Sequence, residues 1–342
     1  MSRHRAAASG GDGPRAGGLR LGLCCQFVRE PIRFRTSTAA ALLRLAPRER
    51  QARLAALCRH NADALMAALR YCAARGIGAF RVLSQILPLK THPTVGYALK
   101  ELPDGEQIVR AFRACGDFAR AHGLRLTFHP DQFVVLNTPN RRAWSHALAE
   151  LDYQAEVAEW VGADTITLHG GGAYGDKATA LRVLRQNLER LPERVRSRLA
   201  LENDDRIYTP SDLLPVCADA GVPFVYDVHH HRCRPDGLDV AAVTERAVAT
   251  WNREPLFHIS SPLAGWRGPR PERHHDYIDP RDFPRAWLGR VLTVEVEAKA
   301  KELAVLRLRR WLARVTARTP RSFGLEAERA DSTLSDLQDS LP

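Results

Sequence analysis

The stretch PFVYDVHHH, residues 223–231, joins an apolar run to one carboxylate and three consecutive imidazoles. The run is short and rich in aromatic and β-branched side chains, which is typical of a strand buried on both faces. Its last residues, in contrast, are of the kinds that bind metal ions. A buried strand that ends in this way indicates a site at that edge of a sheet.

Further segments of strand type occur along the chain. They alternate with segments in which apolar residues have helical spacing. Besides 223–230, the expected strands are residues 19–27, 77–84, 124–130, 164–172, 199–205, 256–261 and 291–298. The expected helices are residues 49–74, 104–122, 142–161, 177–191, 209–221, 238–250 and about 299–316. Buried strands separated by helices predict a parallel sheet, and eight such units favour an α/β fold with one closed (β/α)₈ TIM barrel.

The two ends of the chain differ in composition from the part between them. Residues 1–18 are basic and rich in Gly and Ala, and residues 319–342 are polar and acidic, so both are expected to be disordered tails around a barrel domain at 19–318. No apolar run reaches about 18 residues, and the N-terminus lacks the apolar core of a signal peptide. Seven scattered cysteines without a C-x-x-C pair predict a cytoplasmic protein without disulfides.

The net charge of +11 suits a polyanionic partner such as nucleic acid. Only five of the 50 basic residues are lysine, however, and such a preference for arginine often reflects genome base composition. The charge alone therefore does not identify the partner.

In barrels of this class, active sites lie where the carboxyl ends of the strands meet. Potential ligands stand at or near these ends: His129, His169, Glu202, Asp227, His258, Glu295 and Glu297, with His92, His274, His275 and Asp276 in adjoining loops. A single histidine there would ordinarily be a hydrogen-bonded polar group. The recurrence of histidines or carboxylates on six strands, always at the same end, favours bound cations, because gathered carboxylates and imidazoles otherwise suppress each other's ionisation.

His, Asp and Glu ligands without thiolates suit Mn²⁺, Zn²⁺ or Fe²⁺, and their number predicts about two or three ions. Such sites are well suited to phosphodiester hydrolysis. If the strand at 223–230 continues, its period of two places Asp227 and His229 on one face. If the chain turns after Asp227, His230 can take the place of His229.

Two loops add to this prediction. Backbone N–H groups of HGGGAYGDK, residues 169–177, could bind a phosphate, although tight turning alone also explains the glycines. HPDQFVVLN, residues 129–137, places Gln132 and Phe133 beside the expected metals, where they could enter a distorted base stack or form an ordinary packed loop. Further candidates for DNA contact are Arg35, Lys90, Tyr174 and Arg232.

A series of motifs in this order resembles the UV damage endonuclease family, a divergent branch of which would include this chain. The motifs are RLGLCC (20–25), FRVLSQILPLKTHP (80–93), FHPDQFVVL (128–136), HGGGAYGDK (169–177), LENDD (201–205), YDVHHH (226–231), HISS (258–261), HHDYI (274–278) and EAKAKELAVLRL (297–308). The family is similar in fold to xylose-isomerase-like barrels and to apurinic endonucleases.

The resemblance implies a manganese-dependent nick immediately 5′ to damaged bases in double-stranded DNA, which would place the protein with the nucleoid in the cytoplasm. It implies as metal ligands His92, His129, His169, Glu202, Asp227, His230, His258, His274 and Glu297. Gln132 and Phe133 match the pair that probes damage. As catalytic residues we expect Glu202 and Glu297, with Lys177 or Lys299 neutralising developing charge unless these lysines form structural ion pairs.

Three departures from the family pattern are visible. Leu256 stands where the family usually has a lysine that is thought to become a carboxylated metal bridge. Phe133 and Leu23 replace tyrosines. Two alternatives therefore stay open: a metal-dependent sugar isomerase or epimerase on the same barrel, and a relative that binds damaged DNA without cleaving it.

Overall fold

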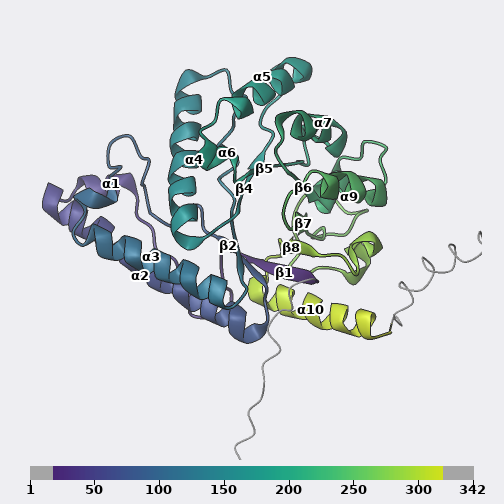
Figure 1. Cartoon of the computed structure of the whole chain (residues 1–342), viewed down its shortest axis with the longest axis horizontal. Coiled ribbons are helices and arrows are strands. Elements are labelled where there is room, and N and C mark those ends of the chain that lie inside the picture. Colours follow the sequence, from purple (N-terminus) through teal and green to yellow (C-terminus); the bar gives the residue numbers. More distant parts are fainter. Residues whose placement is uncertain (1–17, 319–342) are drawn as a thin grey trace, which may run out of the picture.

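Eight parallel strands close into a barrel in the order of the sequence (Figure 1). The computed structural model describes residues 18–318, so the two predicted tails lie outside the described residues except for Gly18. The strands are β1 (Leu19–Cys24), β2 (Ala79–Val82), β3 (Arg125–Phe128), β4 (Thr165–His169), β5 (Leu199–Glu202), β6 (Phe224–Asp227), β7 (Leu256–Ile259) and β8 (Leu292–Val296). Because β1 pairs with both β2 and β8, the sheet has no free edge, and the predicted barrel is confirmed.

Helices surround this barrel (Figure 1). They are α1 (Ala39–Leu43), α2 (Pro47–Arg75), α3 (Gly105–Ala121), α4 (Arg141–Val161), α5 (Lys177–Glu189), α6 (Glu193–Arg196), α7 (Pro210–Ala220), α8 (Val228–Cys233), α9 (Val240–Ala249) and α10 (Lys301–Arg318). Three short 3₁₀ helices, η1 (Leu99–Glu101), η2 (Pro280–Asp282) and η3 (Arg285–Trp287), lie in the connections. No helix in residues 18–318 has the length and apolar character to cross a membrane.

The ends of the long helices follow from local residues. α4 starts after Asn140, whose side chain accepts hydrogen bonds from the backbone N–H groups of Arg142 and Ala143. It ends at Gly162, which adopts a left-handed conformation with φ of 71° that costs glycine nothing. These local signals explain why the helix boundaries could be predicted closely.

Side chains alternate between the inside of the barrel and the layer beneath the helices. Phe80, Phe128, Phe224 and Phe257 are fully buried in the apolar core that the helices cover. Residues at the alternate positions face inward, where polar groups predominate toward the carboxyl ends of the strands. The fold therefore concentrates polar side chains at one end of the barrel interior.

The observed strands end earlier than expected, most informatively at β6. The Asp227 carboxylate accepts a hydrogen bond from the His230 backbone N–H at 2.8 Å and caps helix α8, which begins at once with Val228. The extended continuation to residue 230 is thus wrong, and so is the placement of Asp227 and His229 on one face. Helical spacing instead brings His230 to the side of Asp227.

Candidate metal centre

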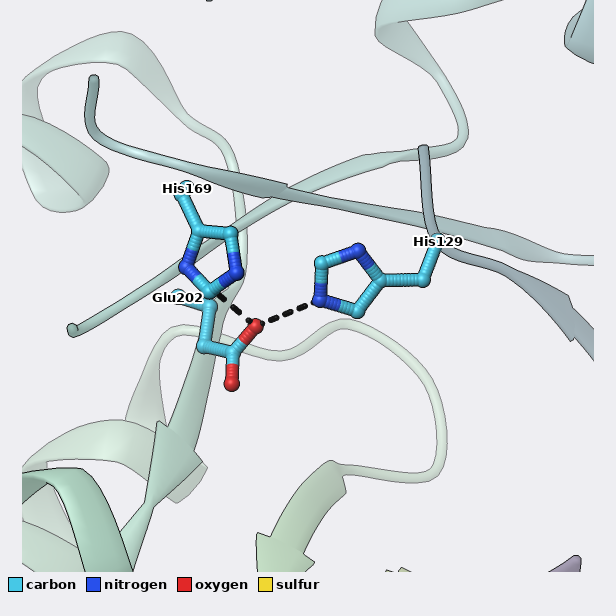
Figure 2. Close-up of side chains that lie close together, drawn as sticks. All are labelled: His129, His169 and Glu202. Carbon is cyan, nitrogen blue, oxygen red and sulfur yellow. Dashed lines mark hydrogen bonds and ion pairs between the residues drawn. The ribbon is translucent and has the colours of Figure 1, made fainter. Parts of the chain in front are cut away.

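The Glu202 carboxylate, at the end of β5, lies at the centre of a group of four imidazoles. Its Oε2 atom is 2.8 Å from His129 Nε2 and 3.7 Å from His169 Nδ1, and Figure 2 shows both rings directed at this oxygen. Its Oε1 atom is 2.8 Å from His258 Nδ1 and 3.6 Å from His230 Nδ1. Glu202 is only 1% exposed, so these contacts are made away from solvent.

Two groups of ligand atoms have the spacing of a metal site. His129, His169 and Glu202 form one group, Glu202, Asp227 and His230 form the other, and within each the ligand atoms lie within 4.8 Å of one another. Glu202 belongs to both, so one carboxylate could bridge two ions. These nitrogen and oxygen donors fit a divalent cation.

Unpaired polar atoms support this interpretation. His169 Nδ1 and Asp227 Oδ2 are buried and have no hydrogen-bond partner among the described residues. Such atoms destabilise a fold unless something binds them. A cation in each group would bind these atoms, one at His169 and the other at Asp227.

The cluster extends toward β8. His258, fully buried on β7, has its Nδ1 atom 3.5 Å from Oε1 of Glu297, which follows β8. The other oxygen of Glu297 lies 3.9 Å from Nδ1 of His274, in the loop after β7. Glu297 and His274 therefore line the same centre as Glu202.

The charges in the cluster depend strongly on one another. Burial alone would raise the pKa of Glu202, but the His258 and His169 imidazoles hold that pKa well below its usual range. Burial lowers the pKa of His169, which favours the neutral imidazole that metals bind. Burial opposes protonation of His230 as well, yet Asp227 and Glu202 raise its pKa to about 9.

Arg81, on β2, was not expected in this cluster. Its guanidinium is buried, with Nη1 2.7 Å from Glu297 Oε1 and Nη2 2.9 Å from His258 Nε2. It also pairs with Glu295 on β8. A charged residue inside the apolar segment 77–84 was the signal in the sequence that could have revealed it.

Not every predicted ligand joins the cluster. His92 Nδ1 faces the backbone N–H groups of Thr94 and Val95, and within residues 18–318 no hydrogen bond, ion pair or ring contact joins His92 to the other candidates. His231 is held between Tyr226 and Asp236, at 2.8 Å from each. His92 and His231 therefore stand apart from the metal-type groups.

His229 is buried away from Glu202, with its ring centre 5.2 Å from those of Trp266 and His274. Leu256 is also fully buried, and it packs with Ala200 and Val225 in a small apolar cluster. The position where the resemblance implies a lysine thus packs against apolar side chains, with Thr293 as its register partner on β8.

The two candidate lysines have different surroundings. Lys177 Nζ lies 2.6 Å from the Asp212 carboxylate. This matches the structural ion pair that we gave as the alternative to a catalytic role for Lys177. Lys299 lines a hollow of about 600 Å³ together with Arg81, His274 and Glu297. Of the two, Lys299 is the lysine beside the cluster.

A second hollow, of about 680 Å³, begins at His169 and His230 and reaches Gln132, Phe133 and Tyr174. The Phe133 side chain is 78% exposed and that of Tyr174 is 51% exposed. Both rings line the same hollow, and apolar surface that is exposed together in this way is typical of binding sites. Both rings are accessible for stacking next to the candidate metal centre.

The expected basic contacts lie in different settings. Arg35 is exposed, whereas Lys90 Nζ lies over the Tyr97 ring at 5.9 Å and Arg232 lies over the Trp266 ring at 5.8 Å. Arg232 also donates a hydrogen bond to the Asp282 carbonyl at 2.8 Å. Only Arg35 is thus fully available at the surface.

The sequence model described as UV-endonuclease UvdE matches residues 19–322. The chain belongs to the UV-endonuclease UvdE family. The UV DNA damage endonuclease of Deinococcus radiodurans is 37% identical over 304 residues, covering 85% of this chain and 94% of that protein. The enzyme of the same name from Bacillus velezensis is 33% identical over 301 residues, covering 83% and 89%.

Solved structures show the fold that UvdE proteins share with other barrels. The crystal structure of SacUVDE superposes with a TM-score of 0.77 at 22% identity and covers 87% of this chain and 99% of that one. Endonuclease IV from Thermus thermophilus gives a TM-score of 0.51 at 21% identity over 73% of this chain and 94% of that one. L-ribulose 3-epimerase gives 0.53 at 13% identity over 79% and 93%. At these identities the comparison concerns architecture alone.

Proposed function

We propose that this protein is a metal-dependent DNA repair endonuclease that cuts the phosphodiester bond 5′ to UV photoproducts or other helix-distorting lesions, acting on DNA in the cytoplasm. Membership of the UvdE family supports the reaction class. The observation that carries the proposal is the position of Glu202 between two groups of metal-type ligands. A shared carboxylate of this kind is suited to paired ions at a scissile phosphate.

The ligand types suit Mn²⁺, with two or three ions and with Zn²⁺ or Fe²⁺ as alternatives. When bound, such ions would stabilise negative charge on the attacking and leaving oxygens. His129, His169 and Glu202 would hold one ion, and Asp227 and His230 would share Glu202 to hold another. His258, His274 and Glu297 would complete the centre. Leu256 offers no group for a bridge, so this centre would rely on carboxylates and imidazoles.

The remaining site residues would position the substrate. Gln132, Phe133 and Tyr174, along the second hollow, would support nucleotides displaced from the damaged stack. Arg35, Lys90 and Arg232 would contact phosphates, with Lys90 and Arg232 first giving up part of their present contacts. Lys299 would neutralise charge near Glu297, whereas Lys177 remains paired with Asp212.

The test uses the full chain with Mn²⁺ and a duplex that contains one photoproduct at a known position, with a second duplex that contains one abasic site. We expect a single nick on the 5′ side of the lesion, mapped on a sequencing gel, and no nick in the undamaged duplex. Failure to cut either substrate, combined with turnover of a ketose, would overturn the proposal in favour of an isomerase or epimerase.

A further inference from the structure

Glu295 is a buried carboxylate beside the metal centre that belongs to neither group of ligand atoms. It lies on β8 and is only 1% exposed. Its Oε2 atom is 3.1 Å from Nε2 of His258, on the edge of that ring opposite the nitrogen that faces Glu202. Glu295 thus contacts the candidate ligand His258 on the side of the ring that faces away from Glu202.

The barrel is built to hold this side chain. Glu295 is the register partner of His258 on β7 and of Gly22 on β1. A Cβ atom added at Gly22 would come within 3.0 Å of Glu295 Cγ. The absence of a side chain at Gly22 therefore leaves the space that Glu295 occupies.

Both oxygens of Glu295 are already bound by protein groups. Thr127 donates its hydroxyl hydrogen to Oε1, and the Arg81 guanidinium donates to Oε2, which His258 also approaches. The Arg81 charge offsets that of Glu295 in a place where water has little access. With no oxygen left open, Glu295 is suited to support a ligand, not to bind an ion itself.

The contacts of His258 divide between its two nitrogens. Nδ1 faces the carboxylates of Glu202 and Glu297, at 2.8 and 3.5 Å, whereas Nε2 faces Glu295 and Arg81. A neutral imidazole carries one N–H, and only its other nitrogen can bind a metal. If Nε2–H donates to Glu295, Nδ1 keeps its lone pair. If Nε2 accepts from Arg81, Nδ1 carries the hydrogen and cannot bind an ion.

We propose that Glu295, held by Arg81 and Thr127, is a positioning residue that accepts the Nε2–H of His258 and so presents Nδ1 as a metal ligand between Glu202 and Glu297. Such carboxylate–histidine–metal arrangements orient the ring and tune the affinity of the site. The inference rests on the metal centre proposed above, and it is independent of the substrate.

Metal affinity tests this role without DNA. We would measure Mn²⁺ binding by equilibrium dialysis for the unmodified protein, Glu295→Leu and Glu295→Gln. Glu295→Leu removes the acceptor and should weaken binding by about 10- to 100-fold. Glu295→Gln keeps one acceptor oxygen and should lose less. Equal affinity in Glu295→Leu and the unmodified protein would overturn the proposal.

A matched control separates positioning from general destabilisation. Glu302 is a buried glutamate at the start of α10 that accepts hydrogen bonds from the backbone N–H groups of Val28, Arg29 and Glu30. Glu302→Gln should lower the melting temperature while Mn²⁺ affinity stays unchanged. A loss of affinity in Glu302→Gln as large as that in Glu295→Leu would count against a specific role for Glu295.

The hydrogen on His258 can be located directly in the unmodified protein, even if a Glu295 variant fails to fold. With ¹⁵N-labelled histidine and Zn²⁺, a spectrum of the imidazole nitrogens should show hydrogen on Nε2 and a metal-shifted Nδ1, with His258→Gln used for assignment. Hydrogen on Nδ1 of the zinc-loaded protein would contradict the proposal. If the unmodified protein bound no metal at all, the metal centre itself would be wrong, whereas normal binding without nicking would contradict only the proposed substrate.

Discussion

Glu202 illustrates how much can depend on one residue in this centre. Its two oxygens face different pairs of histidines, so its side chain joins the two halves of the ligand set. The residue is buried, and replacement of one carboxylate oxygen by an amide nitrogen would leave its shape nearly unchanged. A change of charge at this position can therefore be studied without a large change in packing.

We predict that Glu202→Gln abolishes nicking, with a loss of about 10²-fold or more, because the amide cannot serve two cations as a carboxylate does. Binding of the duplex should survive, since the phosphate contacts lie elsewhere. Gel mapping of nicks and a fluorescence binding assay on the same duplex would measure the two effects. Retained nicking would remove Glu202 from the metal centre.

Phe133 offers a second prediction at this scale. Because its ring is 78% exposed, Phe133→Ala should leave the free energy of unfolding nearly unchanged. Loss of a stacking group worth about 1–3 kcal/mol should reduce the preference for damaged over undamaged duplex. Competition binding would measure this preference, with Val291→Ala as control, because Val291 is also an exposed apolar residue, at 50%, but precedes β8 at the opposite end of the barrel. A preference equal to that of the control would contradict the role of Phe133.

At the scale of elements, the connections after the strands decide where ligands point. Asp227 ends β6 and caps α8, and this one hydrogen bond turns His230 toward Glu202 and His229 away from it. Asp236 then ties the chain after α8 to the start of α7. It accepts hydrogen bonds from the Ser211 backbone N–H at 2.8 Å and from the Ser211 hydroxyl at 2.7 Å, and it lies 2.8 Å from His231 Nε2.

These contacts predict an acid-dependent contribution to stability. Burial alone would raise the pKa of Asp236, but its hydrogen bonds with Ser211, Leu238 and His231 hold that pKa well below its usual range. A lowered pKa in the folded state stabilises the fold above the ordinary carboxyl value of about 3.9, and this contribution is lost as the pH falls toward the folded pKa.

Asp236→Asn should therefore lower the free energy of unfolding at pH 7 by about 1–3 kcal/mol. The difference from the unmodified protein should shrink at pH 3. Urea denaturation of both proteins at the two pH values would measure it. A difference that is constant across this range would show that the charge of Asp236 does not contribute.

At the scale of the whole molecule, the candidate centre exists only in the closed barrel. Its ligands come from positions between His129 and Glu297, on or just after six different strands. In an unfolded chain these side chains would be far apart, so an ion should bind the folded state with strong preference. Metal binding and the stability of the fold are therefore coupled.

We predict that Mn²⁺ raises the melting temperature and that a chelator lowers it. At an ion concentration 100 times the dissociation constant, the expected stabilisation is about 2.7 kcal/mol per site, which amounts to several degrees for a protein of this size. Differential scanning calorimetry would measure the shift, with Mg²⁺ at the same ionic strength as a control. An equal response to both ions would indicate a general salt effect.

The architecture and most of the centre could be predicted from the sequence. The alternation of buried strands and helices is local, and a parallel barrel necessarily brings all carboxyl ends of its strands to one rim. His129, His169, Glu202, Asp227 and His258 therefore had to lie near one another once the barrel closed.

Only the tertiary structure decided which neighbouring side chains turn inward. Strand periodicity left His229 and His230 open, and the Asp227 cap places His230 beside Glu202, as the family resemblance implied. The structure leaves His92 outside the cluster and pairs Lys177 with Asp212. It also revealed Arg81, whose partner Glu295 lies 214 residues away in the sequence. Such contacts escape local patterns because they depend on side-chain direction and on strand register across the closed sheet, which no short stretch of sequence contains.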